Sequence, residues 1–336
     1  MKGRLACTLL VVGALAQLAG SAIAGPAPKL KMSQGNHVLS YAPIYIARSL
    51  QLFRDEGLDM EVIVMESGTI ALHALVAGSV EFDGGTSGDF LNAAVKGMEL
   101  ITVQAQMQMT QNLTARKAFV EKRGVNRSSP FAARVQAMKG ATLGVSRMGA
   151  VSDIFLRYTL KKGGLDPDRD VNIVQIGGAG AIMAALQKGQ IDGFFFSAPT
   201  GEWTEVQGHG LVLIPAGDIP GFDNAVYTIL ETRKSYAAQN PDIVARAARA
   251  LGRANNITLD NPARAKEILQ TYWAKVDPRV ISLSLDILLP RVLRDGLMTE
   301  QGWQAAAQVL KDLGSLKGEV DTREGLYWTN KYLKGM

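Results

Sequence analysis

The stretch ALQKGQID at residues 185–192 repeats, with small changes, the stretch ALVAGSVE at residues 74–81. Each is preceded by a second matched stretch, EGLDMEVIV at 56–64 and GGLDPDRDVNIV at 163–174. In both copies a helical pattern ends at a glycine and a β-branched run follows. An Ala-Leu helix then ends at another glycine before the next strand. This shared order predicts two similar lobes of alternating strands and helices, with α/β architecture and largely parallel sheets.

Turns rich in small residues follow the predicted strands in both lobes. Their sequences are ESGT, GGTSGD, SRMGAVSD and GGAGA, at 66–69, 84–89, 146–153 and 177–181. Such turns leave backbone N–H groups free at the starts of the following helices, where open α/β sheets bind ligands. We therefore expect the two lobes to face each other across a shared cleft lined by these turns.

Residues 1–24 have the pattern of a secretory signal peptide. A basic start precedes a mostly apolar run at 5–19 and a small-residue cleavage site at 22–24. Cys7, the single cysteine, lies at the start of the apolar run, whereas a lipid-accepting cysteine would follow it. We expect cleavage before Gly25 and a free, non-lipidated periplasmic protein without disulfides or zinc–cysteine sites.

Composition narrows the functional classes further. A chain of 336 residues with 47% apolar residues predicts two globular domains. The formal net charge of +5 is spread without basic runs, and aromatic residues do not alternate with basic ones. The sequence therefore predicts no nucleic-acid partner.

Catalytic and cofactor motifs are absent or incomplete. The three histidines, His37, His73 and His209, have no metal-ligand spacing, and no G-x-S-x-G motif occurs. VNIVQIGGAGA at 171–181 begins like a dinucleotide fingerprint, but Met183 stands at the third glycine position. We predict a binding protein without metal, cofactor or catalytic residues, and keep an enzyme on the same fold as a remote alternative.

Several segments resemble the solute-binding proteins of ABC importers, in particular the group for aliphatic sulfonates, taurine, nitrate and thiamine pyrimidine precursors. They are YAPIYIARSLQLFRDEGLDMEVIVMESGTIALHALVAGSVEF (41–82), MKGATLGVSRMGA (138–150), GLDPDRDVNIVQIG (164–177) and AALQKGQIDGFFFSAP (184–199). The resemblance covers most of the chain from about 29 to about 230. It is specific for fold and role and less so for the ligand.

The resemblance implies a two-lobed type II periplasmic binding protein fold with a central ligand cleft. Lobe I would comprise 25–113 and 224–336 and lobe II 114–223, with crossings near 110–119 and 221–230. Apolar residues at helical spacing predict two helices in the C-terminal return, packed on lobe I. The implied partners are an ABC permease with its ATPase in the inner membrane and a small ligand, and the implied state is a monomer.

The candidate ligand-binding residues lie at the predicted helix starts and strand ends. In lobe I they are His37, Ser40, Tyr41, Ser67, Gly68, Thr69, Thr86 and Ser87. In lobe II they are Arg147, Gly149, Ser152, Gly178, Ser197 and Trp203. For each serine and threonine, simple helix capping is an equally good interpretation, and Trp203 could equally be a core aromatic residue.

Arg147 decides which ligand we expect. Its planar guanidinium near a helix start suits the paired oxygens of a sulfonate or carboxylate. The predicted ligand is a small organic anion, sulfonate- or taurine-like, held by helix starts and hydroxyls and enclosed by hinge closure. The alternative is an aromatic carboxylate or a thiamine pyrimidine precursor, stacked on the aromatic side chains of SYAPIY at 40–45.

Overall fold

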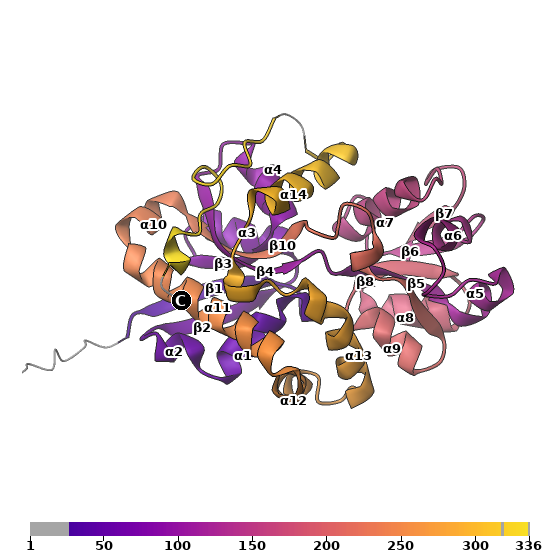
Figure 1. Ribbon diagram of the computed structural model, residues 1–336, viewed down its shortest axis with the longest axis horizontal. Helices are drawn as coiled ribbons and strands as arrows, with labels where there is room; N and C mark the ends of the chain where they lie inside the picture. Colours follow the sequence, from indigo (N-terminus) through magenta and orange to yellow (C-terminus); the bar gives the residue numbers. More distant parts are fainter. Residues whose placement is uncertain (1–26, 317–318, 335–336) are drawn as a thin grey trace, which may run out of the picture.

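The computed structural model describes residues 27–316 and 319–334, which build two five-stranded mixed sheets (Figure 1). The first sheet contains β1 (Lys29–Gly35), β2 (Asp59–Met65), β3 (Phe82–Thr86), β4 (Leu100–Gln108) and β10 (Val226–Arg233). The second contains β5 (Gln111–Arg116), β6 (Thr142–Val145), β7 (Asn172–Gln175), β8 (Gly193–Ser197) and β9 (Gly210–Ile214). The predicted signal peptide, 1–24, lies outside the described residues.

The two sheets have the same design, as the sequence repeat predicts. Their orders are β2-β1-β3-β10-β4 and β7-β6-β8-β5-β9. In the first, β1 pairs in parallel with β2 and β3, and β10 runs antiparallel between β3 and β4. In the second, β6 pairs in parallel with β7 and β8, and β5 runs antiparallel between β8 and β9. Two α/β lobes are therefore confirmed, and the antiparallel strand in each is a feature that the repeat did not predict.

Each antiparallel strand is the first one that the chain forms after it changes sheet. The chain leaves the first sheet after Gln108 and enters the second at Gln111. It leaves the second sheet after Ile214 and returns at Val226. Strand pairing thus assigns residues 111–113, which the predicted division places in lobe I, to the second sheet. The domain boundaries themselves stay a prediction.

The helices connect and cover the strands. Before the first crossing they are α1 (Ala42–Ser49), α2 (Leu52–Asp55), α3 (Gly68–Val76) and α4 (Ser87–Ala94). Between the crossings they are α5 (Lys117–Arg123), α6 (Phe131–Gln136), α7 (Val151–Lys162), α8 (Ala179–Gln187) and α9 (Thr200–Val206). After the return they are α10 (Lys234–Gln239), α11 (Pro241–Asp260), α12 (Pro262–Tyr272), α13 (Pro278–Leu288) and α14 (Glu300–Asp312). Within 27–316 and 319–334, none of them has the length and apolar composition that crossing a bilayer requires.

The Ala-Leu helices of the repeat are α3 and α8. They are followed by Gly78, with φ 76°, and Gly189, with φ 68°, and this left-handed backbone explains the glycine in both copies. The helical pattern at 42–57 is broken where one continuous helix was expected. Gln51 takes φ 56° between α1 and α2, and Leu52 just after it is still buried.

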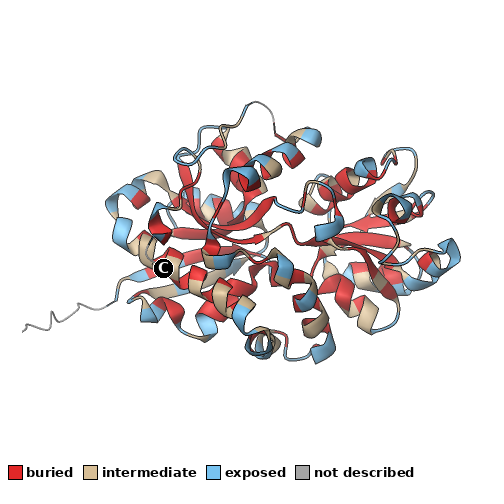
Figure 2. Cartoon of the chain, in the orientation of Figure 1, coloured by how far each residue is buried: buried red, intermediate tan, exposed pale blue. Residues whose placement is uncertain are grey.

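Buried residues concentrate on the strands and on the helix faces turned toward them (Figure 2). The predicted C-terminal helices are α11, which contacts α1 and β4, and α14, which contacts α4 and β10. Both therefore pack on the first sheet, as expected. In contrast, α13 contacts α9 beside the second sheet as well as α12, so part of the C-terminal return bridges the two halves.

Candidate ligand-binding site

The segments that follow the parallel strands carry most of the predicted site residues. In each sheet the three parallel strands end at the same edge, so the turns after β1, β2 and β3 gather there, and so do those after β6, β7 and β8. The two groups of turns meet where the backbone N–H of Leu39 donates to the carbonyl of Ala198 at 3.1 Å. This contact joins the segment after β1 to the segment after β8.

At the start of α4, three side chains hold one another in place. Thr86 caps the helix, because its hydroxyl accepts from the Asp89 N–H at 3.3 Å, and it donates to the Asp89 carboxylate at 2.9 Å. The Ser87 hydroxyl donates to the carbonyl of Val226 at 2.6 Å. Thr86 and Ser87 are thus both engaged in capping and in anchoring β10.

The other predicted hydroxyls on this side also have partners in the chain. The Ser67 hydroxyl accepts from the N–H of Ile70 at 3.3 Å and caps α3. The Ser40 hydroxyl lies 2.7 Å from that of Thr110, at the first crossing. Thr69 hydrogen-bonds the Asp89 carboxylate. A side chain on Gly68 would meet that carboxylate at 2.7 Å, so glycine leaves room for it.

Asp89 was not among the predicted site residues, although the turn GGTSGD contains it. Its carboxylate receives hydrogen bonds from the Thr86 and Thr69 hydroxyls, and burial raises its pKa. Within the described ranges it makes no ion pair with a lysine, arginine or histidine. A sequence signal for it existed, since an acid three residues after a capping threonine is a capping-box pattern.

Tyr41 and Tyr227 lie near Asp89. Only 4% of Tyr41 is exposed, and its hydroxyl has no hydrogen-bond partner in the part of the chain that the structure describes. Burial, and then the nearby Tyr227, Asp83 and Asp89, raise the pKa of Tyr41 well above its usual range. Tyr227 accepts a hydrogen bond from the side-chain amide of Gln111 at 3.2 Å. Gln111 begins β5, so this bond ties the Tyr227 hydroxyl to the first crossing.

Behind Asp89, two carboxyl groups face each other inside the first sheet. Asp83 and Glu231 are paired positions on β3 and β10, and both are fully buried. The Ser33 hydroxyl donates to Asp83 at 2.8 Å, but Oδ2 of Asp83 and both carboxylate oxygens of Glu231 have no protein donor among the described residues. Burial raises the pKa of both groups. We infer that the two acids share a proton.

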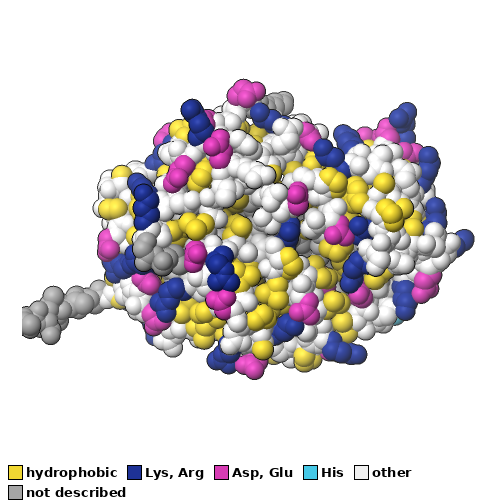
Figure 3. All heavy atoms as spheres, viewed as in Figure 1, with side chains coloured by type: hydrophobic (Ala, Val, Ile, Leu, Met, Phe, Trp, Pro, Cys, Tyr) yellow, Lys and Arg dark blue, Asp and Glu magenta, His cyan; other side chains and the backbone are white. Residues whose placement is uncertain are grey.

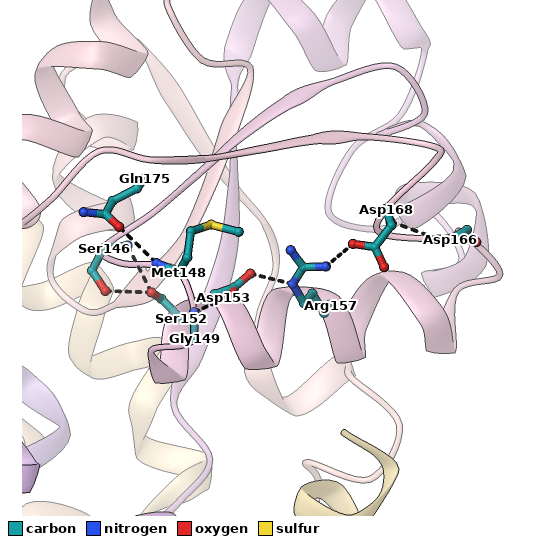
Figure 4. A network of polar contacts seen from close by, with 9 residues as sticks. All are labelled: Ser146, Met148, Gly149, Ser152, Asp153, Arg157, Asp166, Asp168 and Gln175. Carbon is teal, nitrogen blue, oxygen red and sulfur yellow. Dashed lines mark hydrogen bonds and ion pairs between the residues drawn. The ribbon is translucent and has the colours of Figure 1, made fainter. Parts of the chain in front are cut away.

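On the second sheet, the turn after β6 is closed by its own side chains (Figure 4). The Ser152 hydroxyl accepts from the Ser146 N–H at 3.1 Å, and the Asp153 carboxylate accepts from the Gly149 N–H at 2.7 Å. The Met148 N–H points to the side-chain oxygen of Gln175, at 3.3 Å. These backbone donors, which the sequence analysis expected to be free for an anion, are occupied by groups of the chain itself.

Arg147 lies in the same turn and is exposed. Its side chain forms no hydrogen bond or ion pair with any residue in 27–316 or 319–334, in contrast to that of Arg157, which pairs with Asp153 at 2.7 Å. Gly178 is exposed and precedes α8, whose start has no side-chain cap. Among the described residues, Arg147 is therefore a cation, and the start of α8 an N–H-donating feature, that remain open on this side.

His37 belongs to an aromatic cluster. Its ring stacks on Trp273 with centroids 4.4 Å apart and an angle of 24° between the planes, and it is tilted against Tyr45 at 5.3 Å. Burial and the nearby Arg48 lower its pKa. The sequence could not show this environment, because Trp273 follows α12, far away in the chain.

The last two predicted residues differ in burial. Ser197, at the end of β8, is 7% exposed and pairs with Gln111 across the strands. Trp203 on α9 is half-buried and packs against the apolar cluster built mainly by α1, α11 and α13. This packing matches the alternative role of Trp203 as a core aromatic residue.

A cavity of about 790 Å³ lies between α3 and α4. Asp89 and Thr69 line it, together with Leu72, Val76, Ala93 and other residues of the two helices. A second cavity, of about 420 Å³, lies beside β5 and includes His209. In the described ranges no group of three His, Cys, Asp or Glu side chains is arranged to hold a metal ion.

The chain is similar in sequence to several known proteins. The chain is 23% identical over 304 residues to the putative binding protein YtlA of Bacillus subtilis (strain 168), covering 87% of this chain and 85% of that protein. It is 26% identical over 315 residues to the nitrate import ATP-binding protein NrtC of Synechocystis, covering 90% of this chain but only 45% of that protein.

The fold has close counterparts among solved structures. The periplasmic aliphatic sulphonate binding protein SsuA of Escherichia coli superposes with a TM-score of 0.69 and 19% identity, covering 91% of this chain and 99% of that one. This likeness confirms the type II periplasmic binding protein fold. The model of the NMT1-like family matches residues 25–272, more than half of the sequence. The chain therefore belongs to the NMT1-like family.

Proposed function

We propose that this chain is the solute-binding component of an ABC import system, and that it captures a small organic anion between its two sheets. The relatives and the fold support the general role, since YtlA and SsuA are both named as binding proteins. The two crossings support capture by hinge closure, because the second sheet is joined to the first mainly through them and through α13.

The exposed guanidinium of Arg147 is the observation that favours an anionic ligand. A planar group with several donors and no partner among the described residues suits a sulfonate or carboxylate. The open start of α8 would add N–H donors. A sulfonate- or taurine-like compound combines the anionic group with a small size.

The turns whose N–H groups are already used within the chain leave few backbone donors for a ligand. Gly149 and Met148 already donate within the chain, so fewer helix starts can serve the ligand than the sequence suggests. Micromolar affinity requires roughly 8 kcal/mol, while a helix start contributes roughly 0.3 to 1 kcal/mol. Charge-assisted hydrogen bonds must therefore supply much of the binding energy.

The second candidate ligand is a thiamine pyrimidine precursor. Asp89 favours it, because a carboxylate can accept from an amino group on a pyrimidine ring. The faces of Tyr41 and Tyr45 do not favour stacking, since both side chains are almost fully buried.

Isothermal titration of a ligand panel tests the function. The panel contains taurine, ethanesulfonate, nitrate, benzoate and the aminopyrimidine precursor, and one anion should bind with micromolar affinity or better. Small-angle scattering should then show a smaller radius of gyration with ligand. A bound ligand without any change in radius would contradict hinge closure, and chemical turnover of the ligand over hours would support an enzyme instead.

Location and delivery belong to the same proposal. The chain would be secreted by the signal peptide, act as a free periplasmic monomer, and pass its ligand to a permease driven by an ATPase. N-terminal sequencing of a periplasmic extract should begin at Gly25, and a product that begins at Met1 would contradict secretion by cleavage.

A further inference from the structure

Asp89 lies at the edge of the first sheet where the predicted site residues gather. It stands in the first turn of α4, directly after β3, and its carboxylate is held by Thr86 and Thr69. Both of these groups donate from neutral hydroxyls, and no basic side chain of the described residues neutralises the carboxylate. A partly buried carboxylate without a cation has lost hydration that a positively charged ligand group could replace.

Within the described residues, the surroundings supply no cation that neutralises this carboxylate. Asp83 and Glu231 lie close enough to Asp89 for their charges to interact, and no lysine or arginine contributes at any of the three groups. The partial positive charge at the start of α4 is not available to an incoming anion, because the Asp89 carboxylate already lies in the first turn of that helix. A sulfonate placed here would be repelled, whereas an amine would be attracted.

Tyr41 is an independent sign that a ligand group binds at this place. Only 4% of Tyr41 is exposed, and its hydroxyl has no hydrogen-bond partner among the described residues, yet this oxygen is not one of the fully enclosed side-chain atoms that lack a partner. The hydroxyl is therefore accessible and can donate to or accept from a ligand group. The charges of Asp83 and Asp89 act on this hydroxyl, so Tyr41 lies in the same part of the first sheet as the Asp89 carboxylate.

We propose that Asp89, together with the hydroxyl of Tyr41, binds a positively charged amine of the ligand. This inference rests on the proposed function and makes it more specific: the ligand is an amine-bearing organic anion. Its acidic group is bound elsewhere, with Arg147 as the available cation. Asp89 then determines specificity, because compounds that lack the amine leave its charge without compensation.

Matched pairs of compounds test the role of Asp89. Taurine and ethanesulfonate differ only in the amine, and so do β-alanine and propionate. By calorimetry, the wild-type protein should bind at least one amine-bearing compound about tenfold or more tightly than its partner. Asp89→Asn keeps an oxygen for the Thr86 hydroxyl but removes the charge. It should weaken the amine-bearing compound about tenfold to a hundredfold and leave its partner nearly unchanged.

Tyr41→Phe separates ligand binding from stability. The hydroxyl forms no hydrogen bond within the described chain, so the thermal midpoint should not fall. Affinity for the amine-bearing compound should fall about two- to tenfold. Glu121→Gln, at an exposed position on α5, is the control that removes one negative charge far from the site and should change no affinity.

Three other outcomes would overturn the inference. If both members of a pair bind equally, or if Asp89→Asn weakens both alike, Asp89 does not recognise an amine, while the proposed capture of an anion still stands. If no compound in either pair or in the larger panel binds, the proposed function and this inference fail together.

Discussion

The ammonium of Lys162 on α7 lies 2.9 Å from a carboxylate oxygen of Asp312 on α14. The pair therefore joins a helix beside the second sheet to one that packs on the first. The same side is held by the Tyr158 hydroxyl, which donates to the carbonyl of Pro220 at 2.9 Å. Charges of both signs are otherwise spread over the surface (Figure 3). Because the Lys162–Asp312 pair links the two halves, it is well placed to affect their closure.

Asp312→Asn should weaken ligand binding modestly. Both side chains are partly exposed, so the pair contributes at most about 1 kcal/mol, or roughly fivefold in affinity, at low salt. In 1 M NaCl the Debye length falls to about 3 Å, and the variant and wild type should bind equally. Titrations at both salt concentrations measure this. Asp260→Asn, which removes a pair with Arg294 on the first-sheet side alone, is the control; an equal loss at high salt would show that the effect is not electrostatic.

Arg147→Ala should lower the affinity for the best anionic ligand by about tenfold to a hundredfold. The loss corresponds to a charged hydrogen bond of about 1.5 to 3 kcal/mol. Arg147→Lys should recover only part of it, because an ammonium cannot make the planar two-point contact. Since Arg147 has no partner in the described chain, the thermal midpoint should stay the same. An alanine variant that binds within about twofold of wild type would mean that Arg147 only faces solvent.

The shared proton of Asp83 and Glu231 should make the protein less stable as the pH rises. Burial raises the pKa of Asp83 from 3.8 to about 7. Above pH 3.8 the folded state binds more protons than the unfolded state, so the free energy of unfolding falls as the pH rises through about 7. It continues to fall above pH 7, because the pKa of Glu231 is raised well above its usual range. From pH 5 to pH 8 the loss should be at least about 2 kcal/mol in urea denaturation.

The double variant Asp83→Asn, Glu231→Gln should remove most of this slope, because neutral amides can hydrogen-bond without a shared proton. A smaller slope should remain, since burial also raises the pKa of Glu202 to about 7. Glu121→Gln is the control and should keep the wild-type profile. If the double variant keeps it too, the two acids do not hold a proton in the folded state.

Gly85→Ala should destabilise the protein by about 1 to 3 kcal/mol. A side chain there would overlap Oε1 of Glu231 and lie 2.7 Å from Oδ2 of Asp83. Gly180→Ala is the matched control, because nothing lies within 4 Å of the added carbon and the position is helical. It should leave stability unchanged or raise it by up to about 1 kcal/mol. Thermal or urea denaturation of the two variants compares them directly, and equal stabilities would mean that the carboxyl pair can move aside.

The elements that could be predicted are those set by local sequence. The glycine ends of α3 and α8, and the apolar spacing of α11 and α14, depend on neighbours within a few turns. The positions of β5 and β10 in the sheets could not be predicted, because their partners are distant in sequence. For the same reason the repeat indicated parallel sheets without an antiparallel strand.

The candidate site shows the same limit. The turns were correctly placed at helix starts, as the caps of Ser67 and Thr86 confirm. Which groups stay open could not be seen, because Gly149 is occupied by Asp153 and Met148 by Gln175 only in the folded chain. Asp89 was overlooked for a related reason: the absence of a cationic partner is a property of the surroundings and not of the turn.

The late arrival of β10 has a consequence for biosynthesis. When residues up to Gln108 have been synthesised, four strands of the first sheet are present. The strand that pairs with both β3 and β4, β10, is complete only when Arg233 has been added. Their unpaired edges can meet other chains during that interval. The first half must therefore wait for the second to be synthesised, and a chaperone that covers the edge of β3 would improve the yield of folded protein.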